Sequence, residues 1–194
     1  TVEPAFSLSP GVYNGSVNVE LTSATPGASI YYTLNNTAPT IASTLYTGPI
    51  LTDASTMIRA IAFRDDYLPS EAVVSRYTIL AEDVRQFSSN LPLVVLDTYT
   101  RFPNETTFTE VAAAVIDVDP SGRAMLGGEA DYYGRGAFKL RGSSSLGFPK
   151  QQYAFEVWDE AGADRAVSLL GMPEESDWII YAPYSEKALM QNAL

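Results

Sequence analysis

The chain alternates apolar and polar side chains in short windows, and this period-two pattern predicts β-strands along most of its length. Aromatic and β-branched residues, which favour strands, are concentrated in the same windows. Pairs such as Pro26-Gly27 and Gly48-Pro49 separate the windows and predict turns. Four such windows come first, at residues 16–21, 29–34, 57–63 and 73–79. Short strands at this spacing predict a β-sandwich of the immunoglobulin or fibronectin III type over residues 1–80.

The pattern changes after residue 80. Residues 81–90 are polar and predict a linker or a short helix. Five apolar or alternating windows follow, at residues 91–97, 109–118, 136–141, 152–157 and 177–182. Ser185 then has the character of an N-cap, with a helix predicted over 187–192. We therefore predict a mainly β protein in which an α+β, strand-rich second domain spans 91–194.

Composition excludes several kinds of chemistry. The chain of 194 residues contains no Cys and no His, which excludes zinc sites built on those side chains and catalysis by Ser-His-Asp or Cys-His groups. A net charge of −11 argues against nucleic-acid partners, whose phosphates need a basic face. No apolar run approaches the length of about 18 residues that a membrane span requires. We expect no metal ligands within this chain.

The first domain resembles a known accessory module. The resemblance rests on residues 26–33, 43–50, 58–63 and 67–70, and extends over about 5–80. These segments are similar to the chitobiase/β-hexosaminidase C-terminal type of Ig-like module. The resemblance implies a secreted accessory β-sandwich without catalytic residues of its own. Asn35-Asn36 stands where this family usually has Asp-Gly, and because Asn tolerates positive φ we expect the turn to be kept.

A glycine- and serine-rich loop between two predicted strands carries the strongest candidate chemistry. It runs from Arg141 to Lys150 and contains Gly142, Ser143 and Ser144. Backbone N–H groups in such a loop, with cationic side chains at both ends, suit a phosphate group. The same pattern also occurs in ordinary turns.

The second domain resembles the N-terminal part of the CotH kinase family, which consists of secreted atypical kinases. Four blocks carry the resemblance, at residues 139–144, 148–150, 169–173 and 176–189. It implies a kinase-like N-lobe that binds ATP with Mg²⁺ or Mn²⁺. In the intact parent, such a domain would phosphorylate Ser or Thr of extracellular or coat proteins. The implied location is extracellular or at a bacterial cell surface.

The resemblance also implies roles for individual residues. The loop with Gly142, Ser143 and Ser144 would cover the phosphates, as in kinases. Lys150 is the first candidate for a phosphate contact and Arg141 the second, while Lys139 alternates in phase with Arg141 and shares its face. Glu186 would pair with such a lysine. No residue is assigned as the catalytic base, so we expect this chain to be inactive without the remainder of the parent protein.

One acidic segment and one set of tyrosines each allow two interpretations. Residues 117–122 begin like a Ca²⁺ loop, but Gly128 stands where the loop needs Glu, which favours a plain turn. Tyr31, Tyr32, Tyr46 and Tyr67 either line a glycan-binding face or pack in the core, and packing is favoured. Trp158 and Trp178 are predicted to anchor the second core. The alternative function is accordingly a non-catalytic adhesion, matrix or glycan-binding module outside the cell.

Overall fold

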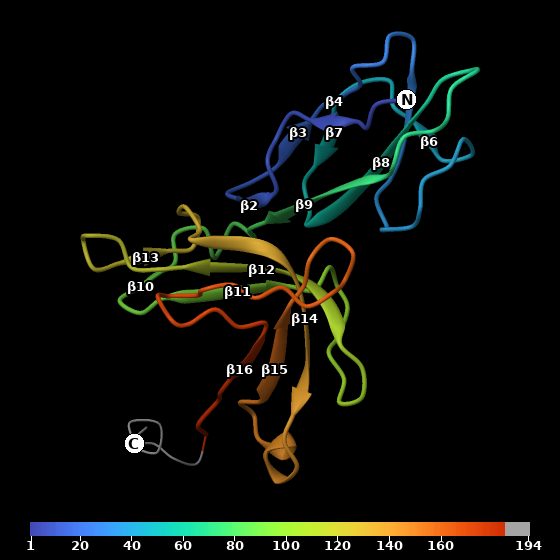
Figure 1. The fold of residues 1–194 in the computed structure, drawn as a ribbon. Coiled ribbons are helices and arrows are strands. Elements are labelled where there is room, and N and C mark those ends of the chain that lie inside the picture. Colours follow the sequence, from blue (N-terminus) through green and yellow to red (C-terminus); the bar gives the residue numbers. More distant parts are fainter. Residues whose placement is uncertain (185–194) are drawn as a thin grey trace. The chain divides into compact units, whose positions relative to one another are not determined.

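The structure is a computed structural model that describes residues 1–184, except for the side chain of Ser144. The chain divides into two compact units. The first contains Thr1–Leu93 and Ile116–Ala130, and the second contains Val94–Val115 and the described residues from Asp131 onward. Both are built from β-strands, and the helical structure within the described residues is limited to one short 3₁₀ turn (Figure 1). The prediction of a mainly β protein is confirmed.

A five-stranded sheet forms one layer of the first unit. Its order is β2 (Gly11–Tyr13), β9 (Val73–Ile79), β8 (Thr56–Phe63), β5 (Ser29–Thr33) and β6 (Thr44–Leu45). β2 pairs in parallel with β9, and the other neighbours are antiparallel. Asn36 has a φ of 60° in the turn that follows β5, so Asn takes the left-handed conformation expected there.

Two short strand pairs form the opposing layer. They are β1 (Ala5–Phe6) with β4 (Leu21–Thr22), and β3 (Val17–Val19) with β7 (Ile50–Thr52). The core lies between the layers and takes side chains from both: Val19, Leu21, Ile30, Ile50, Ile58, Ala60, Ala62 and Tyr77. This arrangement is that of a β-sandwich, in which alternate residues of each strand point inward.

Tyr77 is the largest fully buried side chain of the first core. Its hydroxyl donates a hydrogen bond of 3.1 Å to the carbonyl of Leu8. Burial raises the pKa of Tyr77 above the ordinary value of 10.0. The folded state therefore resists ionisation of this phenol.

This burial predicts a loss of stability in alkali. Because the pKa of Tyr77 is raised in the folded state, its contribution is complete below the unfolded value of 10.0 and is lost as the pH rises above it. We expect Tyr77→Phe to lose about 0.5–1.5 kcal/mol at neutral pH with its hydrogen bond, and to weaken less than the unchanged chain above pH 10. Urea unfolding at neutral and alkaline pH measures both effects. Tyr67→Phe, at an exposed tyrosine, is the control and should leave the pH dependence unchanged.

Residues 81–90 form turns and a short strand rather than a helix. The amide of Val84 donates to the Ala81 carbonyl, and that of Phe87 to the Val84 carbonyl. β10 (Ser88–Ser89) then pairs with β13 (Ala124–Met125). Asn14 donates through Nδ2 to the Gly127 carbonyl at 3.3 Å, which ties the segment around β13 to the sandwich. The domain limits predicted at residues 80 and 91 stay a prediction.

A second five-stranded sheet dominates the second unit. Its order is β11 (Leu93–Asp97), β12 (Thr109–Ile116), β14 (Tyr132–Arg141), β15 (Gln152–Val157) and β16 (Asp177–Ile180). β14 is the central strand and runs antiparallel to both β12 and β15. The five strands match the five windows predicted for this part of the sequence.

The two faces of this sheet differ in chemistry. One face carries the second core, to which β12, β14 and β15 contribute Val111, Ala113, Val115, Phe138, Phe155 and Val157, with Leu169 from a later loop. The alternate residues Glu110, Arg135 and Lys139 therefore lie on the opposite face. The helix predicted at 187–192 lies outside the described residues. Within residues 1–184 there is no helix with the length and hydropathy needed to cross a membrane.

Candidate functional site

The loop between β14 and β15 is a tight, largely self-bonded turn. Its central part is the 3₁₀ turn η1 (Ser144–Gly147). The amide of Leu146 donates to the Ser143 carbonyl and that of Phe148 to the Ser145 carbonyl. Gln151 donates through Nε2 to the Leu146 carbonyl at 3.2 Å. These two amides are thus engaged within the loop and do not offer their N–H groups to a ligand.

Glycine is required at the start of this loop. Gly142 has a φ of 127°, a conformation that side-chain-bearing residues rarely adopt. A Cβ at this position would also overlap the hydroxyl of Ser145. Gly142 thus lets the chain leave β14 and turn sharply over Ser145.

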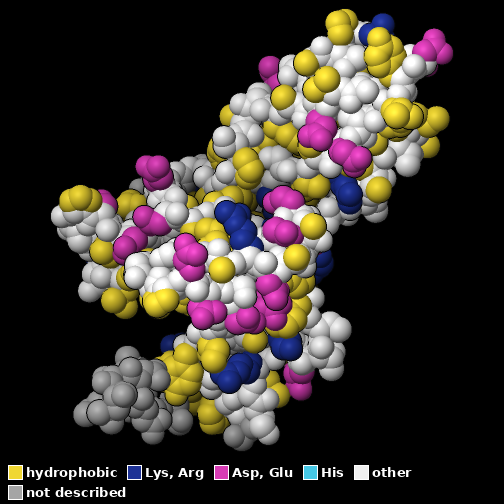
Figure 2. All heavy atoms as spheres, viewed as in Figure 1, with side chains coloured by type: hydrophobic (Ala, Val, Ile, Leu, Met, Phe, Trp, Pro, Cys, Tyr) yellow, Lys and Arg dark blue, Asp and Glu magenta, His cyan; other side chains and the backbone are white. Residues whose placement is uncertain are grey.

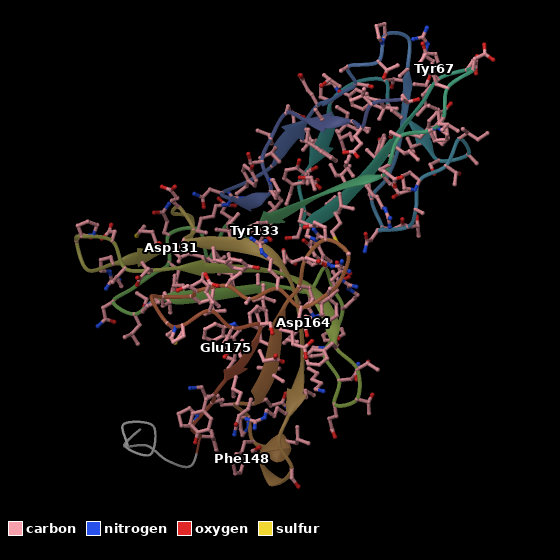
Figure 3. The ribbon with its side chains drawn as sticks, in the orientation of Figure 1. Tyr67, Asp131, Tyr133, Phe148, Asp164 and Glu175 are labelled. Atoms are coloured by element: carbon pink, nitrogen blue, oxygen red, sulfur yellow. The ribbon has the colours of Figure 1, made fainter. Side chains whose placement is uncertain are left out.

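An aromatic contact holds the far end of the loop. Phe148 lies near the tip of the loop (Figure 3), and its ring centroid is 5.1 Å from that of Tyr184, which follows β16. The contact joins the loop to a segment more than 30 residues later in the chain. It was not predicted from the sequence.

Three cations stand on or beside the loop. In the register of β14 with β15, Lys139 lies opposite Ala154 and Arg141 opposite Gln152. Because they are two residues apart in one strand, the Lys139 and Arg141 side chains lie on the same face of β14, as predicted. Lys139 places its Nζ 4.3 Å from the centroid of the Phe108 ring. Arg141 and Lys150 are exposed, and neither forms an ion pair with any carboxylate in the part of the chain that the structure describes.

The remaining predicted site residues divide into two groups. Gly142 and Ser143 are exposed in the loop, and Ser144 belongs to its 3₁₀ turn. Glu186 lies outside the described residues, so its pairing with a lysine stays a prediction. Within residues 1–184, no group of three or more acidic side chains is placed to hold a metal ion.

The block at residues 169–173 forms a turn against the second core. Leu169 is buried in that core. Leu170 and Gly171 both have positive φ, at 53° and 73°, and the Met172 amide closes the turn on the Leu169 carbonyl at 3.0 Å. Trp178 also packs against this core, as predicted, whereas Trp158 lies on the opposite face of the sheet.

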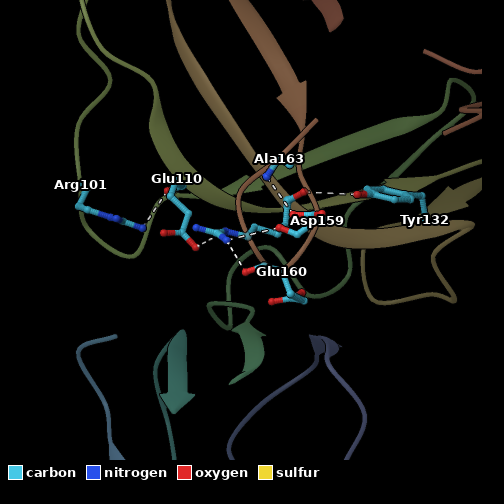
Figure 4. Close-up of polar contacts among 7 residues, drawn as sticks. Arg101, Glu110, Tyr132, Asp159, Glu160 and Ala163 are labelled. Atoms are coloured by element: carbon cyan, nitrogen blue, oxygen red, sulfur yellow. Dashed lines mark hydrogen bonds and ion pairs between the residues drawn. The ribbon is translucent and has the colours of Figure 1, made fainter. Parts of the chain in front are cut away.

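A polar network lies on that opposite face (Figure 4). Arg135 donates through Nε to Glu110 Oε1 at 2.9 Å, and both side chains are largely buried, with 17% and 12% of their surface exposed. Arg135 also donates to the Glu160 carbonyl at 2.7 Å. Arg101 donates to the Glu110 carbonyl at 2.9 Å. Arg135 of β14 pairs directly with Ala112 of β12. Glu110, two residues before Ala112, is therefore the diagonal neighbour of Arg135 on the sheet.

An open hollow of about 630 Å³ lies beside this network. We call it the aromatic hollow; its lining residues are Thr100, Arg101, Phe102, Phe108, Thr109, Glu110 and Trp158. The rings of Phe108 and Trp158 are 6.3 Å apart. Trp158 donates through Nε1 to Glu156 Oε2 at 3.0 Å.

The geometry bears on two other sequence interpretations. Asp119 accepts hydrogen bonds from the hydroxyl and amide of Ser121 and the amide of Arg123, which identifies a turn at residues 117–122. The Ser121 hydroxyl, followed by the Arg123 amide, lowers the pKa of Asp119. Tyr32 and Tyr46 pack against the first core, as predicted, whereas Tyr67 is exposed and stacks with Arg64 at 4.5 Å.

Comparison with known families bears on the first unit. Residues 8–75 match the model of the chitobiase/beta-hexosaminidase C-terminal domain. This match agrees with the resemblance to the same family seen over about 5–80 in the sequence, and it lies within the β-sandwich. The matched residues include β2 to β8 and the start of β9, and none of them belongs to the second unit.

No curated protein and no solved structure matched the chain. The CotH kinase family was not matched either. The assignment of the second unit thus depends on its residues and geometry.

Sequence reasoning missed the aromatic hollow: of its lining residues it singled out only Trp158, and that as an anchor of the second core. Arg101 and Phe102 precede β12 in a segment without periodicity, so no pattern marked them. The alternation in β12 does place Glu110 on the face opposite Val111, which was the one available signal.

Proposed function

We propose that this chain is the N-terminal portion of an extracellular or surface-associated atypical protein kinase of the CotH type. In this proposal the β-sandwich is an accessory module and the second sheet belongs to the nucleotide-binding lobe. The intact parent would transfer the γ-phosphoryl of ATP to Ser or Thr of extracellular or coat proteins. The carboxylates that bind Mg²⁺ or Mn²⁺ would come from the other lobe.

One observation carries this proposal. The central strand of the second sheet ends in two cations on one face, Lys139 and Arg141, and continues directly into a glycine-dependent loop that returns as β15. A strand, a tight loop over the phosphates and a nearby cation are the parts that a kinase lobe supplies. Lys150, at the other end of the loop, adds a third positive charge that no carboxylate within residues 1–184 neutralises.

The overall charge makes these cations distinctive. The chain has 23 acidic and 12 basic residues. Three cations around one loop therefore give this loop a positive charge in a chain that is negative as a whole. On the face shown in Figure 2, Lys and Arg side chains are interspersed with Asp and Glu and form no continuous basic area. A local phosphate site fits this distribution better than an extended polyanion does.

Titration calorimetry with ATP and Mg²⁺ or Mn²⁺ tests the role assigned to this chain. Because this chain would supply only one side of the nucleotide site, we expect it not to bind ATP at micromolar concentrations. Binding with a micromolar or lower Kd would contradict the proposed division of the site between two lobes.

A further inference from the structure

We propose that the aromatic hollow is a binding site for a neutral oligosaccharide. This site differs from the loop at residues 141–150 and from the tyrosines of the first unit. The proposal rests on four features of the described residues: exposed aromatic rings, a rigid polar rim, balanced charge and strained backbone.

The rings provide the stacking surface. Phe102 is 89% exposed, an unusual degree for a phenylalanine, and lies in the lining together with Phe108 and the half-buried Trp158. The face of an aromatic ring carries negative potential, which attracts the C–H groups on the flat side of a pyranose. A volume of about 630 Å³ lies within the range of small-ligand sites and accommodates more than one sugar ring.

The rim provides polar groups that are held in place. Arg101 is fixed at two points, by Nε to the Thr98 carbonyl at 3.2 Å and by its terminal nitrogen to the Glu110 carbonyl at 2.9 Å. Glu110 is fixed in turn by Arg135. Arg101 is exposed and has further N–H groups, so it can donate to sugar hydroxyls without rearranging.

The charges of the lining select a neutral ligand. Arg101 is the one cation and Glu110 the one anion among the lining residues. Directly behind the lining, Arg135 pairs with Glu110, Lys139 lies over the Phe108 ring, and Glu156 accepts from Trp158. A charged ligand would therefore meet charges of both signs within this small area, which weakens its net attraction. Ring stacking with hydrogen bonds to uncharged hydroxyls is the recognition that remains.

The backbone that presents Arg101 and Phe102 is strained. Tyr99 and Thr100 have positive φ values of 50° and 68°, unfavourable for residues with side chains and most of all for β-branched Thr. The Arg101 amide bonds to the Thr98 carbonyl at 3.0 Å and closes this turn, and Asp97 Oδ1 accepts from the Tyr99 amide. Backbone strain held by hydrogen bonds beside a hollow is typical of ligand sites.

The two tryptophans give a direct test, because they lie on opposite faces of the sheet. Indole N–H signals of the ¹⁵N-labelled chain are followed by NMR during titration with neutral tetrasaccharides of glucose, N-acetylglucosamine, mannose or xylose. We expect at least one to shift the Trp158 signal with a millimolar or lower Kd and to leave Trp178 unmoved. Phe102→Ala should raise that Kd about tenfold or more.

Leu68→Ala, which removes another highly exposed apolar side chain in the first unit, should leave the Kd unchanged. No Trp158 shift with any tetrasaccharide, equal shifts of both indoles, or an unaltered Kd in Phe102→Ala would overturn the proposal. So would a Trp158 shift caused by ATP with Mg²⁺ and by none of the sugars. These titrations involve no phosphoryl transfer, so their failure leaves the kinase proposal standing.

Discussion

Phe155→Ala is expected to lower the free energy of unfolding of the second unit by about 3–4 kcal/mol. Phe155 is only 3% exposed and packs in the second core among Val115, Phe138 and Trp178. Truncation to Ala removes the buried phenyl ring and leaves a cavity beside an existing apolar hollow of about 190 Å³. Urea unfolding followed by tryptophan fluorescence reports this unit, because both tryptophans belong to it.

Two control substitutions sharpen the measurement. Phe102→Ala makes the same chemical change at a position that is 89% exposed, so its effect should stay within about 0.5 kcal/mol. Ile58→Ala leaves a cavity in the first core and should lower the free energy of unfolding of the first unit by about 2–4 kcal/mol. The unfolding midpoint reported by tryptophan fluorescence should not change. Equal losses for Phe155→Ala and Phe102→Ala would contradict the assignment of the second core.

Arg135→Ala is expected to destabilise the second unit by about 2–3 kcal/mol, somewhat less than for a fully buried ion pair. The substitution leaves the largely buried Glu110 carboxylate without the guanidinium 2.9 Å away. It also removes a donor from the Asp159 and Glu160 carbonyls. Denaturant unfolding monitored at Trp158, whose ring lies 5.6 Å from this guanidinium, measures the loss.

Arg101→Ala is the matched control, because this exposed arginine bonds only to backbone carbonyls. We expect it to cost about 0.5 kcal/mol or less. The loss of stability in Arg135→Lys should lie between those of Arg135→Ala and Arg101→Ala, since lysine keeps the charge but not the planar set of donors. A loss in Arg135→Ala no larger than in Arg101→Ala would show that the ion pair does not stabilise the sheet.

The strands with clear periodicity were the predictable part of the fold. The windows at 57–63 and 152–157 coincide with β8 and β15 almost residue for residue, because one face of each is buried. The two-residue strands β6 and β10 are too short to show a period and were missed. Their pairing depends on partners far along the chain.

The candidate site divides in the same way. The shared face of Lys139 and Arg141 follows from alternation within one strand, so the sequence was sufficient. The Glu110–Arg135 pair depends on the register between β12 and β14, which the sequence does not encode locally. The contact between Phe148 and Tyr184 likewise depends on where β16 leads the chain.

Phosphoryl transfer by the parent protein tests the central proposal most directly. A protein containing this chain and its proposed catalytic lobe would be incubated with γ-labelled ATP and Mg²⁺ or Mn²⁺, and label would be sought on Ser and Thr by mass spectrometry. We predict labelling that falls about a hundredfold or more in Arg141→Ala and Lys150→Ala, and is unchanged in the exposed control Arg165→Ala. Absence of labelling, or equal labelling in all variants, would contradict the proposal.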